Sequence, residues 1–282
     1  MKRNYEIVIT TPDGLSRSIA PPLSMHIDLT RNTSASTNSA TIRLHNLRQE
    51  TREAIAKDRL NTSSYYAIRV LAGYDRRLSE VFRGNIRECY SLKQGPDWVT
   101  SIVADDGMHA IANGYSSFSI DSGAKNSDVF SRIISDLPGI AEGAIGAIGD
   151  GTKSRGQVIA GSSAKALDDL SEGQFYIDSE TANVLDENEF DIAKTVLLLD
   201  GKRLFTSPRR REAYIEVDTL FLPDCDIGQV CELRSREARM DGQYKVVGFS
   251  HSFTVSQATA GSATTRISLL APSLPLVGRS RR

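Results

Sequence analysis

Few side chains in this sequence have the types and spacing that catalysis requires. Asp105, Asp106 and His109 follow a predicted strand, where paired acids could act in acid–base chemistry or hold a metal ion. Because neighbouring residues on an extended backbone point to opposite faces, Asp105-Asp106-Gly107 is more typical of a turn. The other histidines, His26, His45 and His251, stand singly, without the spacing of a metal site.

Two further motifs match known chemistry only in part. Ser162-Ser-Ala-Lys165 has the Ser-x-x-Lys spacing of penicillin-recognising enzymes, but their companion motifs do not follow, and a helix cap at Ser163 explains it better. Gly146 to Ser154 keeps two glycines of a phosphate-binding loop but places Lys153 one residue late, with no buried strand before it. We therefore expect no catalytic residues, no cofactor and no metal.

Clustered arginines are more suggestive of a partner than of chemistry. Arg209, Arg210 and Arg211 follow a proline, and Arg279, Arg281 and Arg282 end the chain. A solvated loop or tail is one interpretation. The other is contact with an acidic partner surface, because arginine makes bidentate pairs with carboxylates at interfaces.

The composition is that of a soluble globular protein of one to three domains. The chain has 282 residues, 40 % of them hydrophobic, and a net charge of −1, which argues against coating nucleic acid through bulk charge. Cys89, Cys225 and Cys231 have neither zinc-site spacing nor an even count, so we expect reduced, packed thiols. The run Ile7–Ile9 is too short for a signal or membrane segment, which predicts cytoplasmic synthesis and no membrane insertion.

Residues 1–112 are predicted to form a first β domain. Ala40, Ile42 and Leu44 alternate with polar residues, as one-sided burial in a sheet requires. Turns rich in glycine and proline separate the strands, in the rhythm of a sandwich or small barrel. The predicted strands are Tyr5–Ile9, Met25–Thr30, Ala40–Leu44, Tyr66–Leu71, Glu80–Leu92 and Trp98–Ala104.

One short charged helix, Gln49–Ala56, interrupts these strands. Its Ile55 can plug one end of a rolled sheet, while its charges face solvent. Glu50 and Glu53 are therefore candidates for contact with a subunit or a tube.

The rest of the chain divides into a small α+β insert, 113–194, and a second β domain, 195–282, with a basic tail. The insert is predicted to hold helices Asp128–Leu137 and Ala164–Leu170, and a hairpin of Gln174–Ile177 and Asn183–Leu185. Its glycine-rich segment Gly139–Gly156 matches no motif, and its order is left open. The second β domain is predicted to contain Thr195–Leu199, Ala213–Leu220, Gly228–Arg234, Gln243–Phe253 and Ala263–Leu270. We expect the aromatic side chains within strands to pack rather than bind sugar; these are Tyr74, Phe82, Trp98, Tyr244 and Phe249.

Several segments resemble phage baseplate hub proteins. The first group runs from Asn38 through Leu47 and Ala72-Gly-Tyr74 to Val81-Phe-Arg-Gly-Asn-Ile86, which is similar to that family's opening domain. Near the end, Asp226 to Leu233 and Gly242 to His251 look like its last strands. The order and spacing cover most of the chain.

The resemblance implies two tube-like β-barrel domains and a non-enzymatic, structural role. It implies a homotrimer that joins a sixfold tail tube to a threefold spike in the baseplate of a contractile-tail virion, after synthesis in the host cytoplasm. The implied partners are the tail tube protein, the spike protein, other baseplate proteins, and a tape-measure protein or genome passing through the channel. Another tube-end or distal tail protein, a baseplate-borne cell-wall hydrolase and a glycan-binding module stay open as alternatives.

Overall fold

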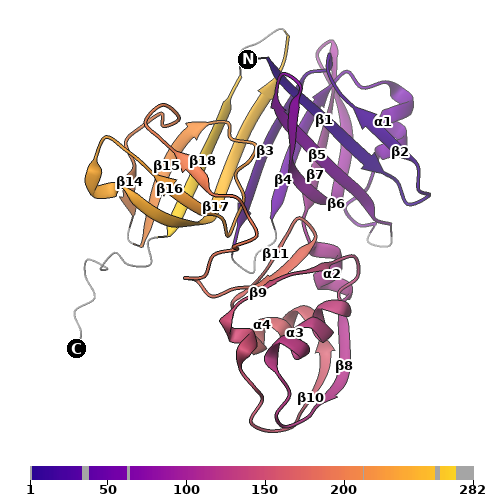
Figure 1. Ribbon diagram of the computed structural model, residues 1–282. Helices are drawn as coiled ribbons and strands as arrows, with labels where there is room; N and C mark the ends of the chain where they lie inside the picture. Colours follow the sequence, from indigo (N-terminus) through magenta and orange to yellow (C-terminus); the bar gives the residue numbers. More distant parts are fainter. Residues whose placement is uncertain (1, 34–37, 62–63, 212, 258–260, 271–282) are drawn as a thin grey trace.

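The computed structural model describes residues 2–33, 38–61, 64–211, 213–257 and 261–270. The chain is mainly β, as predicted. Figure 1 shows a β body with two lobes and a smaller α+β insert that hangs below it. Among the described residues, no helix combines the length and apolar character needed to cross a bilayer.

The first half of the β body follows the predicted alternation closely. In β4, Ala40, Ile42 and Leu44 are buried while their neighbours reach solvent. Helix α1 (Gln49–Ile55) lies against this half, and Ile55 is fully buried, as predicted. The strands are β1 (Arg3–Thr10), β2 (Ser16–Ile19), β3 (Met25–Asn32), β4 (Ser39–His45), β5 (Tyr66–Tyr74), β6 (Arg77–Gln94) and β7 (Asp97–Asp105).

The second half of the body comes from the end of the chain. Its strands are β13 (Leu197–Leu199), β14 (Arg209–Arg211), β15 (Tyr214–Leu220), β16 (Val230–Leu233), β17 (Gly242–Val255) and β18 (Ala263–Leu270), with a short 3-10 turn η2 (Ala238–Met240). Cys225 and Cys231 are buried here, and Cys89 is buried in the first half, all as unpaired thiols.

One sheet joins the two halves. Strand β17 pairs antiparallel with β3, from Gly248 opposite Asn32 to Val255 opposite Met25. The order is β14-β15-β18-β17-β3-β4-β7-β6-β5-β1-β2, and a single hydrophobic core lies under both halves. Over the described residues this path is open at β14 and β2, so the closure of each half into a barrel stays a prediction.

The insert has its own core as well as contacts with the body. Phe130, Ile133, Ile134 and Leu167 of its two longer helices are buried together with residues of its small sheets. Its elements are α2 (Met108–Asn113), β8 (Tyr115–Ile120), α3 (Asn126–Ser135), β9 (Ala141–Ile145), η1 (Ala147–Asp150), β10 (Gln157–Ser162), α4 (Ser163–Leu170), β11 (Phe175–Asp178) and β12 (Thr181–Val184). β8 pairs with β10, and β11, β12 and β9 form the other sheet.

The glycine-rich segment Gly139–Gly156 is ordered by this second sheet. Its strand β9 runs parallel to β12, with Ala141 opposite Thr181. A Cβ at Gly143 would come 2.9 Å from the carbonyl oxygen of Ala182, so glycine permits the two strands to approach. The segment is therefore part of the insert's framework rather than a free loop.

Candidate functional site

A buried ion network lies where the insert meets the β body. Arg31 of β3 and Asp178 at the end of β11 are both almost fully buried. The Arg31 guanidinium donates through Nε to Asp178 Oδ1 at 2.8 Å and through Nη2 to Asp178 Oδ2 at 2.6 Å. This bidentate geometry is the strong form of a charged hydrogen bond, so it fixes the insert's hairpin to the first half of the body.

The second half of the body contributes to the same network. Arg31 also pairs with Asp226, and Lys194 Nζ lies 3.2 Å from Asp226 and 3.4 Å from Asp178. Burial alone would lower the pKa of Arg31, but the charges of Asp178 and Asp226 outweigh it and raise that pKa. Three distant parts of the chain therefore share one set of paired charges.

Asp106 holds the turn between β11 and β12. Its carboxylate accepts hydrogen bonds from the backbone N–H groups of Ser179 at 2.6 Å and Glu180 at 3.0 Å. Both turn residues have positive φ, 53° and 58°, which costs energy for residues other than glycine and is the geometry of a tight hairpin. Burial raises the pKa of Asp106 to about 7, against the effect of those two donors.

Asp105 and Asp106 do not act as a pair. Asp105 lies 3.2 Å from Arg87 of β6, whereas Asp106 serves the insert's hairpin. This agrees with the prediction that these adjacent acids point apart.

The two sequence motifs with partial chemical matches are structural. The backbone N–H of Lys165 donates to Ser162 Oγ at 3.4 Å, so Ser162, and not Ser163, caps helix α4. Ser163 is instead the first helical residue, and its hydroxyl shares a buried hydrogen bond with Ser116 at 2.9 Å. The Gly146–Ser154 segment follows β9, a strand with no fully buried residue, and forms the short η1 in place of the long helix whose N-terminus cradles phosphate.

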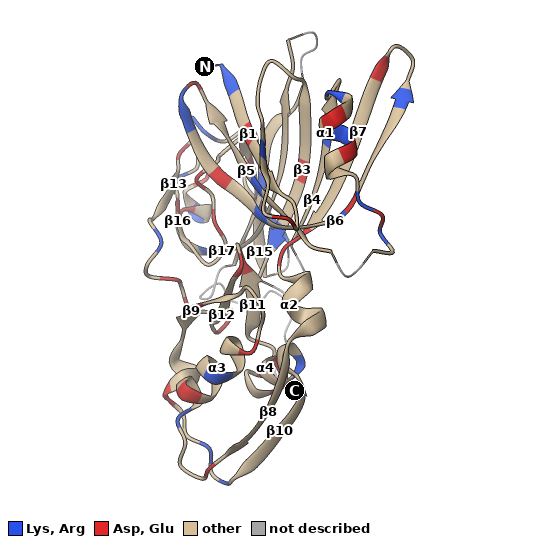
Figure 2. Ribbon diagram, turned by 90° about the vertical axis from the view of Figure 1, so that its right-hand side faces the viewer, with Lys and Arg blue, Asp and Glu red and all other residues tan. Residues whose placement is uncertain are grey.

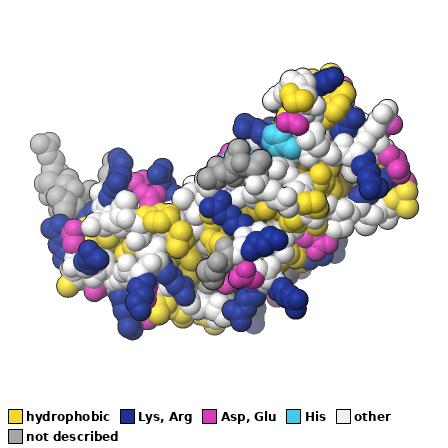
Figure 3. Space-filling model, turned by 90° about the horizontal axis from the view of Figure 1, so that it is seen from above, with side chains coloured by type: hydrophobic (Ala, Val, Ile, Leu, Met, Phe, Trp, Pro, Cys, Tyr) yellow, Lys and Arg dark blue, Asp and Glu magenta, His cyan; other side chains and the backbone are white. Residues whose placement is uncertain are grey.

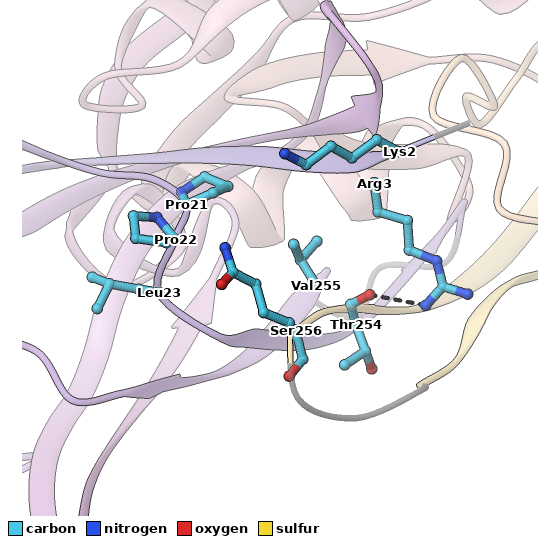
Figure 4. A pocket seen from close by; sticks show the side chains of 9 residues that line it. Lys2, Arg3, Pro21, Pro22, Leu23, Thr254, Val255 and Ser256 are labelled. Carbon is cyan, nitrogen blue, oxygen red and sulfur yellow. Dashed lines mark hydrogen bonds between the residues drawn. The ribbon is translucent and has the colours of Figure 1, made fainter.

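Figure 4 shows a pocket of about 240 Å³ between β1, the Pro21–Leu23 segment and the end of β17. The Arg3 guanidinium donates to the carbonyl oxygens of Thr254 at 3.0 Å and Gly261 at 2.8 Å, which ties β1 to the β17–β18 connection. The lining residues include no carboxylate and no histidine. Their arrangement supports packing of the chain ends and offers no acid–base pair.

His251 is a buried, neutral histidine of β17 that lies among aromatic rings of the β body. Its Nδ1 shares a hydrogen bond with Thr265 Oγ1 at 2.8 Å, and its ring contacts Phe221 and Phe249. Burial, with a smaller effect of the Arg31 charge, lowers the pKa of His251 to about 3. The group therefore stays neutral in the folded protein at pH values where it would be charged in the unfolded chain.

Replacement of His251 by asparagine should flatten the acid side of the stability profile. The folded pKa is below the unfolded value, so the unfolded chain binds an extra proton as pH falls below about 6.5, and stability is lost toward pH 3. Between those limits, wild type should lose about 1.4 kcal/mol per pH unit more than His251→Asn. The raised pKa of Asp106 has the opposite effect on stability as pH falls, but this effect is the same in wild type and in His251→Asn and cancels in the comparison. Urea denaturation of both proteins between about pH 3 and about pH 6.5 measures this difference. Stability profiles that run parallel over this range would refute the prediction.

The predicted acidic contact residues lie on the outside of α1. Glu50 is exposed and 3.7 Å from Arg17 of β2, while Glu53 accepts a hydrogen bond from Gln49 at 2.7 Å. Figure 2 shows the acidic and basic segments of this helix outside the sheet. Both carboxylates are accessible to a partner.

The predicted basic contact residues form a strand at the sheet's edge. Arg209, Arg210 and Arg211 make up β14, all are exposed, and β14 pairs only with β15 in the described sheet. Arg211 lies 3.1 Å from Glu216. Arg279, Arg281 and Arg282 lie outside the described residues.

Among the aromatic residues predicted to pack, Trp98 differs. Phe82, Tyr244 and Phe249 are buried, and Tyr74 packs against the core. Trp98 is 38 % exposed, with the Arg52 guanidinium 3.8 Å from its ring centroid. The prediction of strand packing is wrong for Trp98 because its side of β7 faces α1 and solvent rather than the core.

Seen from above, Lys and Arg are spread along the face with acids between them (Figure 3), so no single-sign patch dominates.

Comparison with known proteins identifies the family. The family model described as baseplate hub gp41 matches residues 5–254, which include the insert and the β body up to the end of β17, with β18 outside the match. The chain belongs to the baseplate hub gp41 family. No curated protein matches the sequence.

Solved structures share the fold of this baseplate hub family member at low identity. A 43 kDa tail protein of prophage MuSo2 from Shewanella oneidensis is 12 % identical, with a TM-score of 0.63 over 95 % of this chain and 97 % of that one. A tail protein from Neisseria meningitidis is 10 % identical, with a TM-score of 0.61 over 95 % and 96 %. The c3393 protein of E. coli, a type VI secretion component, is 8 % identical, with a TM-score of 0.53 over 88 % and 74 %.

Proposed function

We propose that this chain is the structural hub of a phage-type baseplate. Three copies form a ring that joins a sixfold tail tube to a threefold spike, and the ring lines a central channel for the tape-measure protein or the genome. The match of the hub family model across residues 5–254 is the observation that carries the proposal. The chain works through geometry and not as an enzyme.

The open sheet supports assembly with further copies. Its path ends at β14 and β2 among the described strands, and unpaired strand edges need cover to avoid aggregation. A ring of identical subunits covers such edges in a closed arrangement. The shared core and the Arg31 network support a body whose two halves move together, as a rigid adaptor requires.

Electron microscopy of assembled tails, labelled with an antibody against the insert, tests where this chain lies in the phage particle. We expect label at the junction of tube and spike in a contractile-tail virion, beside the tube, spike and other baseplate proteins. Label confined to the tube's far end, or absent from intact tails, would contradict the proposal.

Glu50→Lys combined with Glu53→Lys is expected to weaken ring assembly without unfolding the chain. Both side chains are exposed, so the free energy of unfolding should change by less than about 0.5 kcal/mol. Sedimentation velocity should show the trimer population reduced about tenfold, since like charges across an interface cost several kcal/mol. Glu142→Lys on β9 and Asp169→Lys on α4, both exposed, form the control pair. Unaffected rings in the α1 variant would count against α1 as a contact.

A further inference from the structure

A small pocket lies between the α1–β5 connection, β6 and helix α2. It encloses about 280 Å³ and is lined by charged residues on one side and apolar ones on the other. Figure 2 shows the connection, with its basic segments, beside α2. The backbone of Lys57 exchanges two hydrogen bonds of 2.9 Å with Cys89, which pins the connection to β6.

The charged side is built around a bulge in β6. The register between β6 and β7 shifts between Ile86 and Glu88, so Arg87 is the extra residue, and bulges re-aim such side chains. Arg87 is 3.2 Å from Asp105, and its Nε is buried with no hydrogen-bond partner among the described residues. Because 40 % of the Arg87 side chain is exposed while Nε is enclosed by protein, the outer, Nη end of the guanidinium is the part that another acceptor can reach.

Two more cations adjoin Arg87. Arg59 is exposed, and its charge, like that of Arg87, acts on the Asp105 carboxylate, although Arg59 itself makes no ion pair among the described residues. Lys57 Nζ donates to the Asn61 carbonyl oxygen at 2.6 Å. Among the described lining residues the only acid is Asp105, which is buried and already faces Arg87. The pocket therefore has a surplus of positive charge and favours an anionic group.

The opposite wall is apolar and held by side-chain contacts. The rings of Tyr65 and His109 lie with centroids 3.6 Å apart, and Asn113 Nδ2 donates to the Tyr65 hydroxyl at 3.0 Å. Burial lowers the pKa of His109, which disfavours a charged ring at this wall. Met108 is 38 % exposed at the same wall. An apolar group beside the anion would pack here.

We propose that this pocket receives a glutamate or aspartate side chain of a partner polypeptide, with a neighbouring apolar residue packed on Tyr65, His109 and Met108. The volume of about 280 Å³ is at the low end of ligand pockets, which fits a side chain better than a cofactor. Arg87 and Arg59 supply the planar donors that match a carboxylate. The inference does not depend on a trimer, because it uses neither β14 nor the outer side of α1.

Two N-acetylated peptide amides, Gly-Leu-Glu-Gly and Gly-Leu-Gln-Gly, test the pocket on the full chain. The protein carries 13C-methyl methionine, so the Met108 methyl resonance reports binding at the site, and the chain has only four methionines to assign. We expect the glutamate peptide to shift the Met108 resonance and to bind about tenfold more tightly than the glutamine peptide.

Arg59→Gln is the cleanest variant, because it leaves the Arg87–Asp105 pair intact. It should reduce the affinity for the glutamate peptide about tenfold. Arg87→Lys should also weaken binding, since lysine keeps the positive charge but lacks the planar set of N–H donors that pairs with both oxygens of a carboxylate. Arg76→Gln, at an exposed turn, should leave binding unchanged. Equal binding of the two peptides, an unchanged affinity in Arg59→Gln, or acetate binding as tightly as the glutamate peptide would overturn the proposal.

Discussion

Arg31→Ala is expected to lower the free energy of unfolding by about 3–5 kcal/mol, because it leaves the buried Asp178 carboxylate without its bidentate partner. Asp178 would keep only the more distant Lys194 among its described cations, and Asp226 would lose its Arg31 contact. Chemical denaturation in urea measures the loss. Arg31→Lys should recover only part of it, because lysine cannot make the bidentate pair.

Arg69→Ala provides the control for a similar charge pair at the surface. Arg69 Nε lies 2.8 Å from Glu80, but half of the Arg69 side chain is exposed. Exposed pairs contribute about 1 kcal/mol or less, so this variant should stay close to wild type. If Arg31→Ala also stayed within about 1 kcal/mol of wild type, the network would not be holding the three parts together.

Charge reversal of the β14 arginines, Arg209→Glu with Arg210→Glu and Arg211→Glu, is expected to abolish assembly of the ring with its baseplate partners. The three side chains are exposed on an edge strand, where reversed charges would oppose an acidic partner. The monomer should lose only about 1 kcal/mol, chiefly from the exposed Arg211–Glu216 pair. Reconstitution with purified partners, followed by electron microscopy, measures assembly.

The matched control reverses three exposed arginines elsewhere, Arg76→Glu, Arg77→Glu and Arg155→Glu. It makes the same change in net charge without touching β14. Assembly should survive in this control. Equal loss of assembly in both triple variants would mean that net charge, and not a contact by β14, causes the loss. Intact assembly in the β14 variant would mean that β14 is not part of the interface.

Local features of the fold follow from residue patterns, because they depend on neighbours in sequence. The alternation of Ala40, Ile42 and Leu44 correctly predicted which face of β4 is buried, and Ile55 was correctly predicted as the buried residue of α1. The cap of α4 was misplaced by one residue, since Ser162 and Ser163 are chemically identical. Two hydrogen bonds distinguish them: the Lys165 backbone N–H donates to Ser162 Oγ, and the Ser163 hydroxyl is bonded to Ser116 instead.

Features built from distant segments could not be predicted in this way. The pairing of β17 with β3 joins strands more than 200 residues apart, and no periodicity encodes such a match. Arg31, Asp178 and Asp226 stand in separate parts of the sequence, so their convergence is visible only in three dimensions. The bulge at Arg87 shifts the alternation of β6, because Ile86 and Cys89 are buried with Arg87 and Glu88 between them, but which residue is the extra one follows only from the pairing with β7.

Native mass spectrometry of the full chain, alone and with its spike partner, tests the hub proposal most directly. The proposal predicts a complex of three chains that binds one spike trimer and persists at physiological ionic strength. A chain that stays monomeric at every concentration, even with the spike protein present, would contradict it.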